Sequence, residues 1–144
     1  MVYLAFYKGE GDFLNKVVRL FTRSKYSHCA IVAHCIEYSS TSRMGGVYAQ
    51  RRYIPYDLKE WDLVPVDIPA QDVVAFYNRT KHCKYDYLGA LGIVFTVFKQ
   101  KGSRYFCSEW CAECLRLDKP HKYTPDSLYK RLNKQKKMIN SLHF

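Results

Sequence analysis

Residues 105–115 read Tyr105-Phe106-Cys107-Ser108-Glu109-Trp110-Cys111-Ala112-Glu113-Cys114-Leu115. A short aromatic lead-in runs here into a segment with helical spacing, and we expect a helix over 107–117. Cys111 and Cys114 follow Cys107 at helical intervals, so the three thiols share one helix face, which is typical of a core. Cys107 differs because it opens the helix, where unpaired backbone N–H groups and the helix dipole favour a thiolate.

A second informative stretch covers residues 26–33, which have the composition of a strand and include His28. A histidine on a strand and a cysteine at a helix start are the two groups that a thiol hydrolase combines. Taken singly, the cysteine and the histidine can both be structural, because free cysteines are often buried in cores and a histidine on a strand need not be catalytic. The pair formed by His28 and Cys107 is therefore a hypothesis that requires the two side chains to meet.

The remaining pattern predicts one α+β domain over residues 1–144, with helices packed on a small antiparallel sheet. We expect strands over Val2–Tyr7, His28–Ala33, Cys35–Ser40, Val47–Tyr53 and Trp61–Val66, and a polar loop over Ser39–Gly46. We expect helices over Asp12–Thr22, Ala70–Lys81 and Asp86–Phe98, and another that starts at Thr124. Asp12 is the expected cap of its helix, and the expected apolar face consists of Phe13, Val17, Leu20 and Phe21.

The chain is strongly basic, with a formal net charge of +10 and its densest basic run at residues 130–137. Such a run could contact an anionic polymer, anionic lipid or a host protein, although a solvated helix face is the ordinary interpretation. No nucleic-acid-binding motif accompanies the charge, which argues against a nucleic-acid-binding protein. The 13 tyrosines would also suit a contact surface.

The N-terminus lacks the basic start and long apolar run of a signal peptide, and the most apolar run is only residues 88–98. A membrane-spanning helix needs about 20 apolar residues, so we expect none. The six cysteines are then expected to be reduced thiols in a cytoplasm-like compartment. Zinc is disfavoured because the cysteines that directly follow a histidine would point away from it on a strand. We predict neither a metal nor a cofactor.

Five short segments carry a resemblance to a known family: residues 4–9, 23–28, 45–47, 84–89 and 106–109. With them the chain resembles the circularly permuted branch of the NlpC-type papain-like cysteine hydrolases, the group that includes the YaeF- and YiiX-like lipoproteins. It is also similar to small proteins of tailed bacteriophages and prophages. The most specific elements are the Ser-His pair on a strand and the Cys-Ser-Glu that opens a helix. The resemblance implies a permuted papain-like fold.

The resemblance also implies a role for each matching position. Cys107 would be the nucleophile, His28 would orient it and take its proton, and the backbone N–H of Cys107 would help to hold the oxyanion. Tyr85 would line the cleft next to the nucleophile. The expected substrate contacts are Tyr85, Ser39, Ser27 and Ser108.

A third polar residue usually orients the histidine in this family, and here the family's acid does not align cleanly. The candidates on the neighbouring strand are Glu37, Ser39 and Ser40. Strand alternation places Glu37 and Ser39 on one face and Ser40 on the other, which favours Glu37. A weak third member would leave the imidazole poorly fixed.

Two functions of different classes follow. The first is a phage-encoded Cys–His hydrolase or acyltransferase that forms a thioester on Cys107 and acts on an amide or ester bond. Cell-wall peptides, host proteins and lipid acyl groups are all open as substrates. The second is a non-catalytic binding protein on the same fold that inhibits or redirects a host factor. Either would act in the host cytoplasm, and association with the virion is also open.

Overall fold

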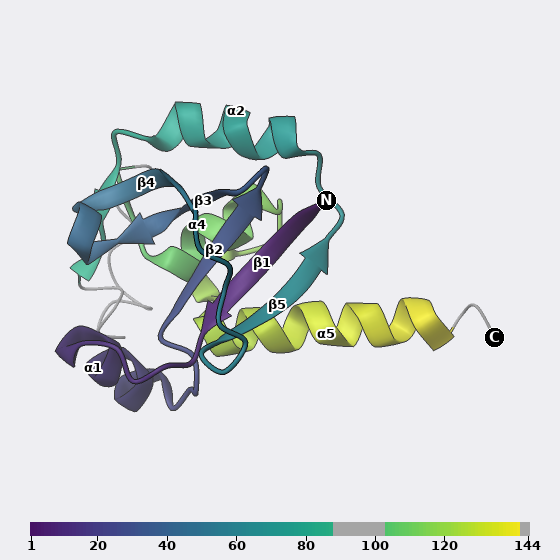
Figure 1. The fold of residues 1–144 in the computed structure, drawn as a ribbon, viewed down its shortest axis with the longest axis horizontal. Helices are drawn as coiled ribbons and strands as arrows, with labels where there is room; N and C mark the ends of the chain where they lie inside the picture. Colours follow the sequence, from purple (N-terminus) through teal and green to yellow (C-terminus); the bar gives the residue numbers. More distant parts are fainter. Residues whose placement is uncertain (88–102, 142–144) are drawn as a thin grey trace.

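The computed structural model describes residues 1–87 and 103–141, and its centre is a seven-stranded sheet in the order β5-β1-β2-β3-β4-β6-β7 (Figure 1). The strands are β1 (Val2–Tyr7), β2 (His28–Ala33), β3 (Ile36–Thr41), β4 (Gly46–Arg51), β5 (Trp61–Val66), β6 (Lys84–Tyr85) and β7 (Arg104–Tyr105). Neighbouring strands are antiparallel, except β6 and β7, which are parallel. The described part of the chain is therefore an α+β fold with a mixed, mostly antiparallel sheet.

The helices of the described residues are α1 (Phe13–Thr22), α2 (Ala70–Thr80), α4 (Cys107–Cys114) and α5 (Pro125–Ser141), with 3-10 turns η1 (Ser42–Met44) and η2 (Pro120–Lys122). α4 packs against β2 and β3 and also contacts α2 and α5. α2 contacts β2 and β4, whereas α5 runs past β5 (Figure 1). Among these helices, none combines the length and the apolar character that crossing a bilayer requires.

The hydrophobic core fills the space between α4 and the sheet. Its largest fully buried side chains are those of Trp110, Tyr26, Phe6, Leu4 and Ile31. Nε1 of Trp110, on α4, donates a hydrogen bond of 2.9 Å to Oγ1 of Thr80 at the end of α2. Burying each large apolar side chain contributes about 1.5–3 kcal/mol, so this packing fixes α4 firmly against β2 and β3.

Several predicted elements are confirmed. The strands over Val2–Tyr7, His28–Ala33 and Trp61–Val66 have the expected bounds, and the helix expected over Ala70–Lys81 ends one residue earlier. Asp12 caps α1 through Oδ1, which accepts the backbone N–H of Asn15 at 3.0 Å. The predicted α+β class is confirmed at the level of a mostly antiparallel sheet packed with helices.

Other expectations need correction. The loop expected over Ser39–Gly46 is shorter, because β3 continues to Thr41 and β4 begins at Gly46. The helix expected over 107–117 ends at Cys114. The apolar face expected for α1 is not buried as a whole, since Phe13 is 81% and Leu20 is 76% exposed. The helix expected over Asp86–Phe98 lies outside the described residues from position 88 onward.

Gly46 allows β4 and β6 to approach each other closely. Its φ is +156°, and a Cβ at this position would overlap the carbonyl oxygen of Cys83. That same carbonyl accepts the backbone N–H of Val47 at 3.0 Å, which ties β4 to the residue before β6. Only glycine has room for this approach. The contact also positions β6, which carries Tyr85.

Candidate active site

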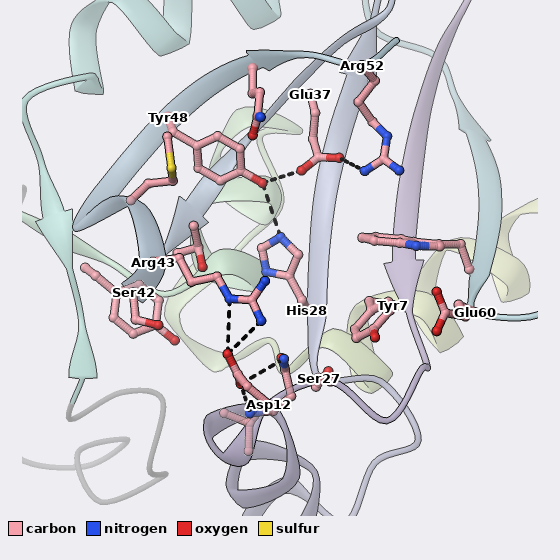
Figure 2. Close-up of a pocket in the computed structure, with 18 residues that line it drawn as sticks. Tyr7, Asp12, Ser27, His28, Glu37, Ser42, Arg43, Tyr48, Arg52 and Glu60 are labelled. Atoms are coloured by element: carbon pink, nitrogen blue, oxygen red, sulfur yellow. Dashed lines mark hydrogen bonds and ion pairs between the residues drawn. The ribbon is translucent and has the colours of Figure 1, made fainter. Parts of the chain in front are cut away.

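A pocket of about 400 Å³ lies beside the start of β2 (Figure 2). Strands β1 to β6, helix α1 and the turn η1 all contribute residues to its wall, which includes His28 and Tyr48. His28 is the first residue of β2, and Cys107 is the first residue of α4, which packs across β2 and β3. The fold thereby brings the start of the cysteine helix to the start of the histidine strand.

The side chains of His28 and Cys107 lie near enough for each to shift the pKa of the other. Burial alone would raise the pKa of Cys107, but hydrogen bonds from Cys29 and His28, together with the charge of His28, lower it to about 5. Burial would likewise lower the pKa of His28, and the hydrogen bond and negative charge of Cys107 outweigh burial and raise it. Each group stabilises the charged form of the other, which favours a thiolate–imidazolium pair.

Cys29 is a second partner of Cys107 that sequence reasoning did not identify. Its side chain and its backbone both help to lower the pKa of Cys107. Burial, followed by the neighbouring Cys107 and Cys111 side chains, raises the pKa of Cys29 well above its ordinary value. Burial thus favours the thiol form of Cys29 next to the thiolate form of Cys107.

Tyr48 connects His28 to Glu37, as Figure 2 shows. Oη of Tyr48 lies 3.5 Å from Nε2 of His28, and the hydroxyl donates its proton to Oε1 of Glu37 in a short hydrogen bond. Glu37, the preferred third member, thus reaches the imidazole through a tyrosine, and its charge helps to raise the pKa of His28. Because Nε2 faces Tyr48, Nδ1 is the ring nitrogen left for Cys107.

Glu37 is buried and is held as a carboxylate by several donors. Its Oε2 accepts hydrogen bonds from Nη1 of Arg52 at 2.9 Å and from the hydroxyl of Tyr56. Burial would raise the pKa of Glu37, but the bonds from Tyr48 and Tyr56, the charge of His28 and the bond from Arg52 lower it. The guanidinium of Arg52 also lies 3.8 Å from the centre of the Tyr56 ring. A fixed negative charge is therefore maintained behind the imidazole.

Three serines that the sequence placed at the site have structural roles instead. Ser39, Ser40 and Ser108 are fully buried, and none of them belongs to the described wall of the pocket. Each donates its hydroxyl proton to a main-chain carbonyl oxygen. Ser39 and Ser108 are thus corrected from substrate contacts to structural residues, because their hydroxyls are already occupied and inaccessible.

Ser27 and Tyr85, which were also expected to contact substrate, are both placed in the pocket wall. Tyr85 is only 6% exposed; burial raises its pKa, and so does the nearby charge of Cys107. Cys107 itself is 1% exposed and does not line the pocket. Tyr85 therefore lies between the pocket, which it lines, and the buried thiol of Cys107, which does not line the pocket.

Aromatic and charged residues complete the pocket, and sequence reasoning missed them. The ring of Trp61 lies 4.9 Å from that of Tyr7 and 6.5 Å from that of His28, measured between centroids. On the opposite side Arg43 forms an ion pair of 2.9 Å with Asp12, and its charge opposes protonation of His28. The missed residues lie on separate strands and turns, so only the strand register could have brought them together.

The described residues contain no group of three or more His, Cys, Asp or Glu side chains arranged to bind a metal ion. All six cysteines are free thiols. The basic run at 130–137 lies on α5, where Lys130 forms an ion pair of 2.7 Å with Asp126. The exposed lysines beyond it are Lys134, Lys136 and Lys137.

The chain was compared with protein-family models, with curated proteins and with solved structures, and none of these comparisons found a match. The chemistry of the site is therefore inferred from its own residues. They provide a buried thiol with a lowered pKa, an imidazole with a raised pKa, and a pocket that the imidazole lines. This combination suits attack on a carbonyl carbon followed by proton transfer.

Proposed function

We propose that this protein is a Cys–His hydrolase or acyltransferase that forms a thioester on Cys107. The observation that carries the proposal is the placement of Cys107, at the start of the helix packed on β2, close enough to His28 at the start of that strand for each side chain to favour the charged form of the other. A thiolate is the nucleophilic form of cysteine, and an imidazolium beside it can supply a proton. The pocket of about 400 Å³ next to His28 has the size of small-molecule sites.

In the proposed reaction, Sγ of Cys107 attacks the carbonyl carbon of an amide or ester, and the C=O electron pair moves onto oxygen. Backbone N–H groups at the start of α4, which have no partner within the helix, stabilise that oxygen. The tetrahedral intermediate then collapses, the C–N or C–O bond breaks, and His28 gives its proton to the leaving amine or alcohol. A thioester and a neutral imidazole remain.

The second half restores the site. His28 takes a proton from water, or from the hydroxyl or amine of an acceptor, which attacks the thioester carbon. Collapse of this second intermediate expels the Cys107 thiolate and releases the acyl group as an acid or as a new ester or amide. Water makes the protein a hydrolase, and another acceptor makes it an acyltransferase. Neither half requires a metal or a cofactor.

The resemblance supports the permuted papain-like family as the setting for this chemistry. The structural support is coarser: an α+β fold in which the cysteine opens a helix packed on the sheet and the histidine opens a central strand. Within that family we propose amide or ester bonds of cell-wall peptides, host proteins or lipids as substrates. A tailed-phage origin and action in the host cytoplasm belong to the same proposal.

A second candidate, a non-catalytic binding protein, is favoured by one observation. Cys107 is 1% exposed and lies outside the pocket wall, so a substrate carbonyl cannot touch it without a movement of the wall. A protein that only binds would have no need for access to the thiol. Its partner would be a host protein or an anionic polymer that contacts the exposed lysines of α5.

An acylation experiment separates the two candidates. The protein is mixed with p-nitrophenyl acetate, and release of nitrophenolate is followed together with the mass of each cysteine peptide. The enzyme predicts an acetyl adduct on Cys107, no adduct there in Cys107→Ala, and acylation slowed at least about 100-fold in His28→Ala. Cys83→Ala, which removes a buried thiol outside the site, should react as the wild type does. Equal, slow acylation of all cysteines would leave only the binding protein.

A further inference from the structure

The described part of the chain contains five buried serines, and four of them have the same kind of partner. Their hydroxyls donate to main-chain carbonyl oxygens at 2.5–3.0 Å: Ser24 to Tyr26, Ser39 to Cys29, Ser40 to Tyr105 and Ser108 to Tyr123. The fifth is Ser27, which is 4% exposed. Its Oγ is buried and has no hydrogen-bond partner among the described residues.

Ser27 is also the one member of this set that lines the pocket. It directly precedes His28, and both residues line the pocket, with Ser27 on the Asp12 side of the imidazole in Figure 2. Its backbone is fixed, because the N–H of Ser27 donates to the carbonyl oxygen of Tyr7 at 3.0 Å. A buried hydroxyl without a partner is unfavourable in a folded protein, and such a group in a pocket wall is free to donate to a ligand that enters the pocket.

The chemistry around Ser27 points to the type of partner. Asp12 already accepts hydrogen bonds from Asn15 and Arg43, and Glu37 accepts them from the residues behind the imidazole. Ser27 has an O–H to donate in the pocket wall and is adjacent to His28 in the chain. The acceptor that an amide or ester substrate brings to this pocket is its carbonyl oxygen, on which negative charge develops during attack.

We propose that Ser27 is a substrate-contacting residue whose hydroxyl donates a hydrogen bond to the carbonyl oxygen of the acyl group that Cys107 attacks. The proposal rests on the proposed function and adds to it a requirement on the substrate. The ligand of this pocket presents a carbonyl oxygen, and not a purely aliphatic surface, next to His28. Ser27 then acts with the N–H groups at the start of α4 on the same developing charge.

The test compares two probes that react with the same thiol, one through a carbonyl carbon and one without a carbonyl. The first probe is p-nitrophenyl acetate, and the second is allyl bromide; both rates are read at the Cys107 peptide. For Ser27→Ala we expect acylation to fall about 10-fold or more and allylation to stay within about twofold of the wild type. Ser24→Ala, a buried serine outside the pocket, should change neither rate.

Thermal unfolding supplies a readout that does not depend on the reaction. Removing the unpaired hydroxyl in Ser27→Ala should leave the melting temperature unchanged or raise it, whereas Ser24→Ala loses a hydrogen bond and should lower it. If Ser27→Ala does not fold, Ser27→Gly removes the same hydroxyl and is measured in its place.

The possible results distinguish failure of this inference from failure of the proposed function. Unchanged acylation in the variant overturns the role of Ser27 and leaves the proposed function intact. An equal loss of acylation and allylation also overturns it, because Ser27 would then act on the thiol and not on the carbonyl. A wild-type protein whose Cys107 reacts no faster than the other cysteines with either probe overturns the proposed function and, with it, this inference.

Discussion

The Oη atom of Tyr48 lies 3.5 Å from Nε2 of His28. The same hydroxyl donates its proton to Glu37, so the tyrosine is a bridge between the imidazole and a buried carboxylate. A protonated His28 can donate to Tyr48 while Tyr48 donates to Glu37, and hydrogen bonds in such a chain strengthen one another. The carboxylate therefore acts on Cys107 through two intermediate side chains.

Tyr48→Phe is expected to weaken the thiolate. The substitution keeps the ring but removes the bridge, so the charged form of His28 loses a hydrogen-bond acceptor and the pKa of Cys107 rises. A hydrogen bond to a charged group contributes about 1.5–3 kcal/mol, and one pKa unit corresponds to about 1.4 kcal/mol. The pH midpoint of iodoacetamide alkylation at Cys107 should therefore move up by about one unit.

Tyr56→Phe is the matched control for this prediction. Tyr56 donates to the other oxygen of Glu37 and makes no hydrogen bond to His28 in the described structure. Its removal perturbs the carboxylate but leaves the bridge in place, so the Cys107 midpoint should move much less than in Tyr48→Phe. Equal shifts in the two variants would show that only the charge of Glu37 matters and not the bridge.

The wild-type protein should show an acidic alkylation midpoint at Cys107. Its pKa is lowered to about 5, whereas an ordinary thiol ionises near 8.5. The rate should be constant at neutral pH and fall as the pH drops through about 5, when the thiolate is protonated. The midpoint reports ionisation even where burial slows the reaction, because burial scales the whole profile.

His28→Ala should move that midpoint upward by several units, since burial then dominates and raises the pKa of Cys107. His82→Ala, which removes an exposed histidine, is the control and should have no effect. Peptide mass spectrometry across pH 4–10 separates Cys107 from the other thiols. A wild-type midpoint near 8.5 would contradict the ion pair.

The sequence predicted the strand and the helix that hold the site residues better than it predicted the contacts between those residues. Alternation and capping located the strand that begins at His28 and the helix that begins at Cys107, because both signals are local. The strand expected from Cys35 begins one residue later, at Ile36, because His34 and Cys35 form the turn with positive φ values of 49° and 61°, which are uncommon for these residue types. Short strands such as β6 and β7 lack a periodic signal altogether.

The register of the strands explains why the sequence did not predict Tyr48 as a site residue. Ser39 pairs with Tyr48 across β3 and β4, which puts the tyrosine diagonally next to Glu37. The registered pairs of β2 and β3 run only from Ile31–Tyr38 to Ala33–Ile36. Beyond them Ser39 links the strands through the Cys29 carbonyl at 2.6 Å. Such pairings depend on the whole sheet, and alternation gives only the face of each side chain.

Cys29→Ala should also raise the alkylation midpoint of Cys107. The variant removes the side chain of residue 29, which helps to lower the pKa of Cys107, but keeps its backbone, so we expect a shift of about one unit. Cys29→Ser keeps a donor and should shift less. Cys83→Ala removes another buried thiol and should leave the midpoint where it is. No shift in Cys29→Ala would assign the lowered pKa to His28 alone.

Gly46→Ala should destabilise the fold and disturb the position of β6. The new Cβ would overlap the carbonyl oxygen of Cys83, a rigid main-chain atom, so we expect a loss of about 2–4 kcal/mol in urea unfolding. Gly45→Ala is the control: its φ is +73°, but nothing lies within 4 Å, so only backbone strain of about 1–2 kcal/mol is expected. Equal losses would mean that β4 and β6 separate easily.

Tyr85→Ala should open the way to Cys107. Tyr85 lines the pocket and is near enough to Cys107 for the thiolate charge to raise its pKa, while Cys107 is 1% exposed. Removing the ring should therefore increase the plateau rate of alkylation at Cys107 by about 10-fold or more, as expected when a covered thiol becomes accessible. The midpoint should change little, because His28 and Cys29 remain in place.

Tyr85→Phe keeps the ring and removes only the hydroxyl. It therefore shows whether the ring limits access to Cys107 or whether the hydroxyl changes the reactivity of the thiol. If the ring covers the thiol, this variant reacts like the wild type, and Tyr85→Ala alone is fast. If the hydroxyl matters instead, both variants change alike, and the change includes the midpoint. A plateau that stays low in Tyr85→Ala would place the obstruction elsewhere and favour the binding protein over the enzyme. A fast Tyr85→Ala with an acidic midpoint would show a competent nucleophile one side chain away from the pocket.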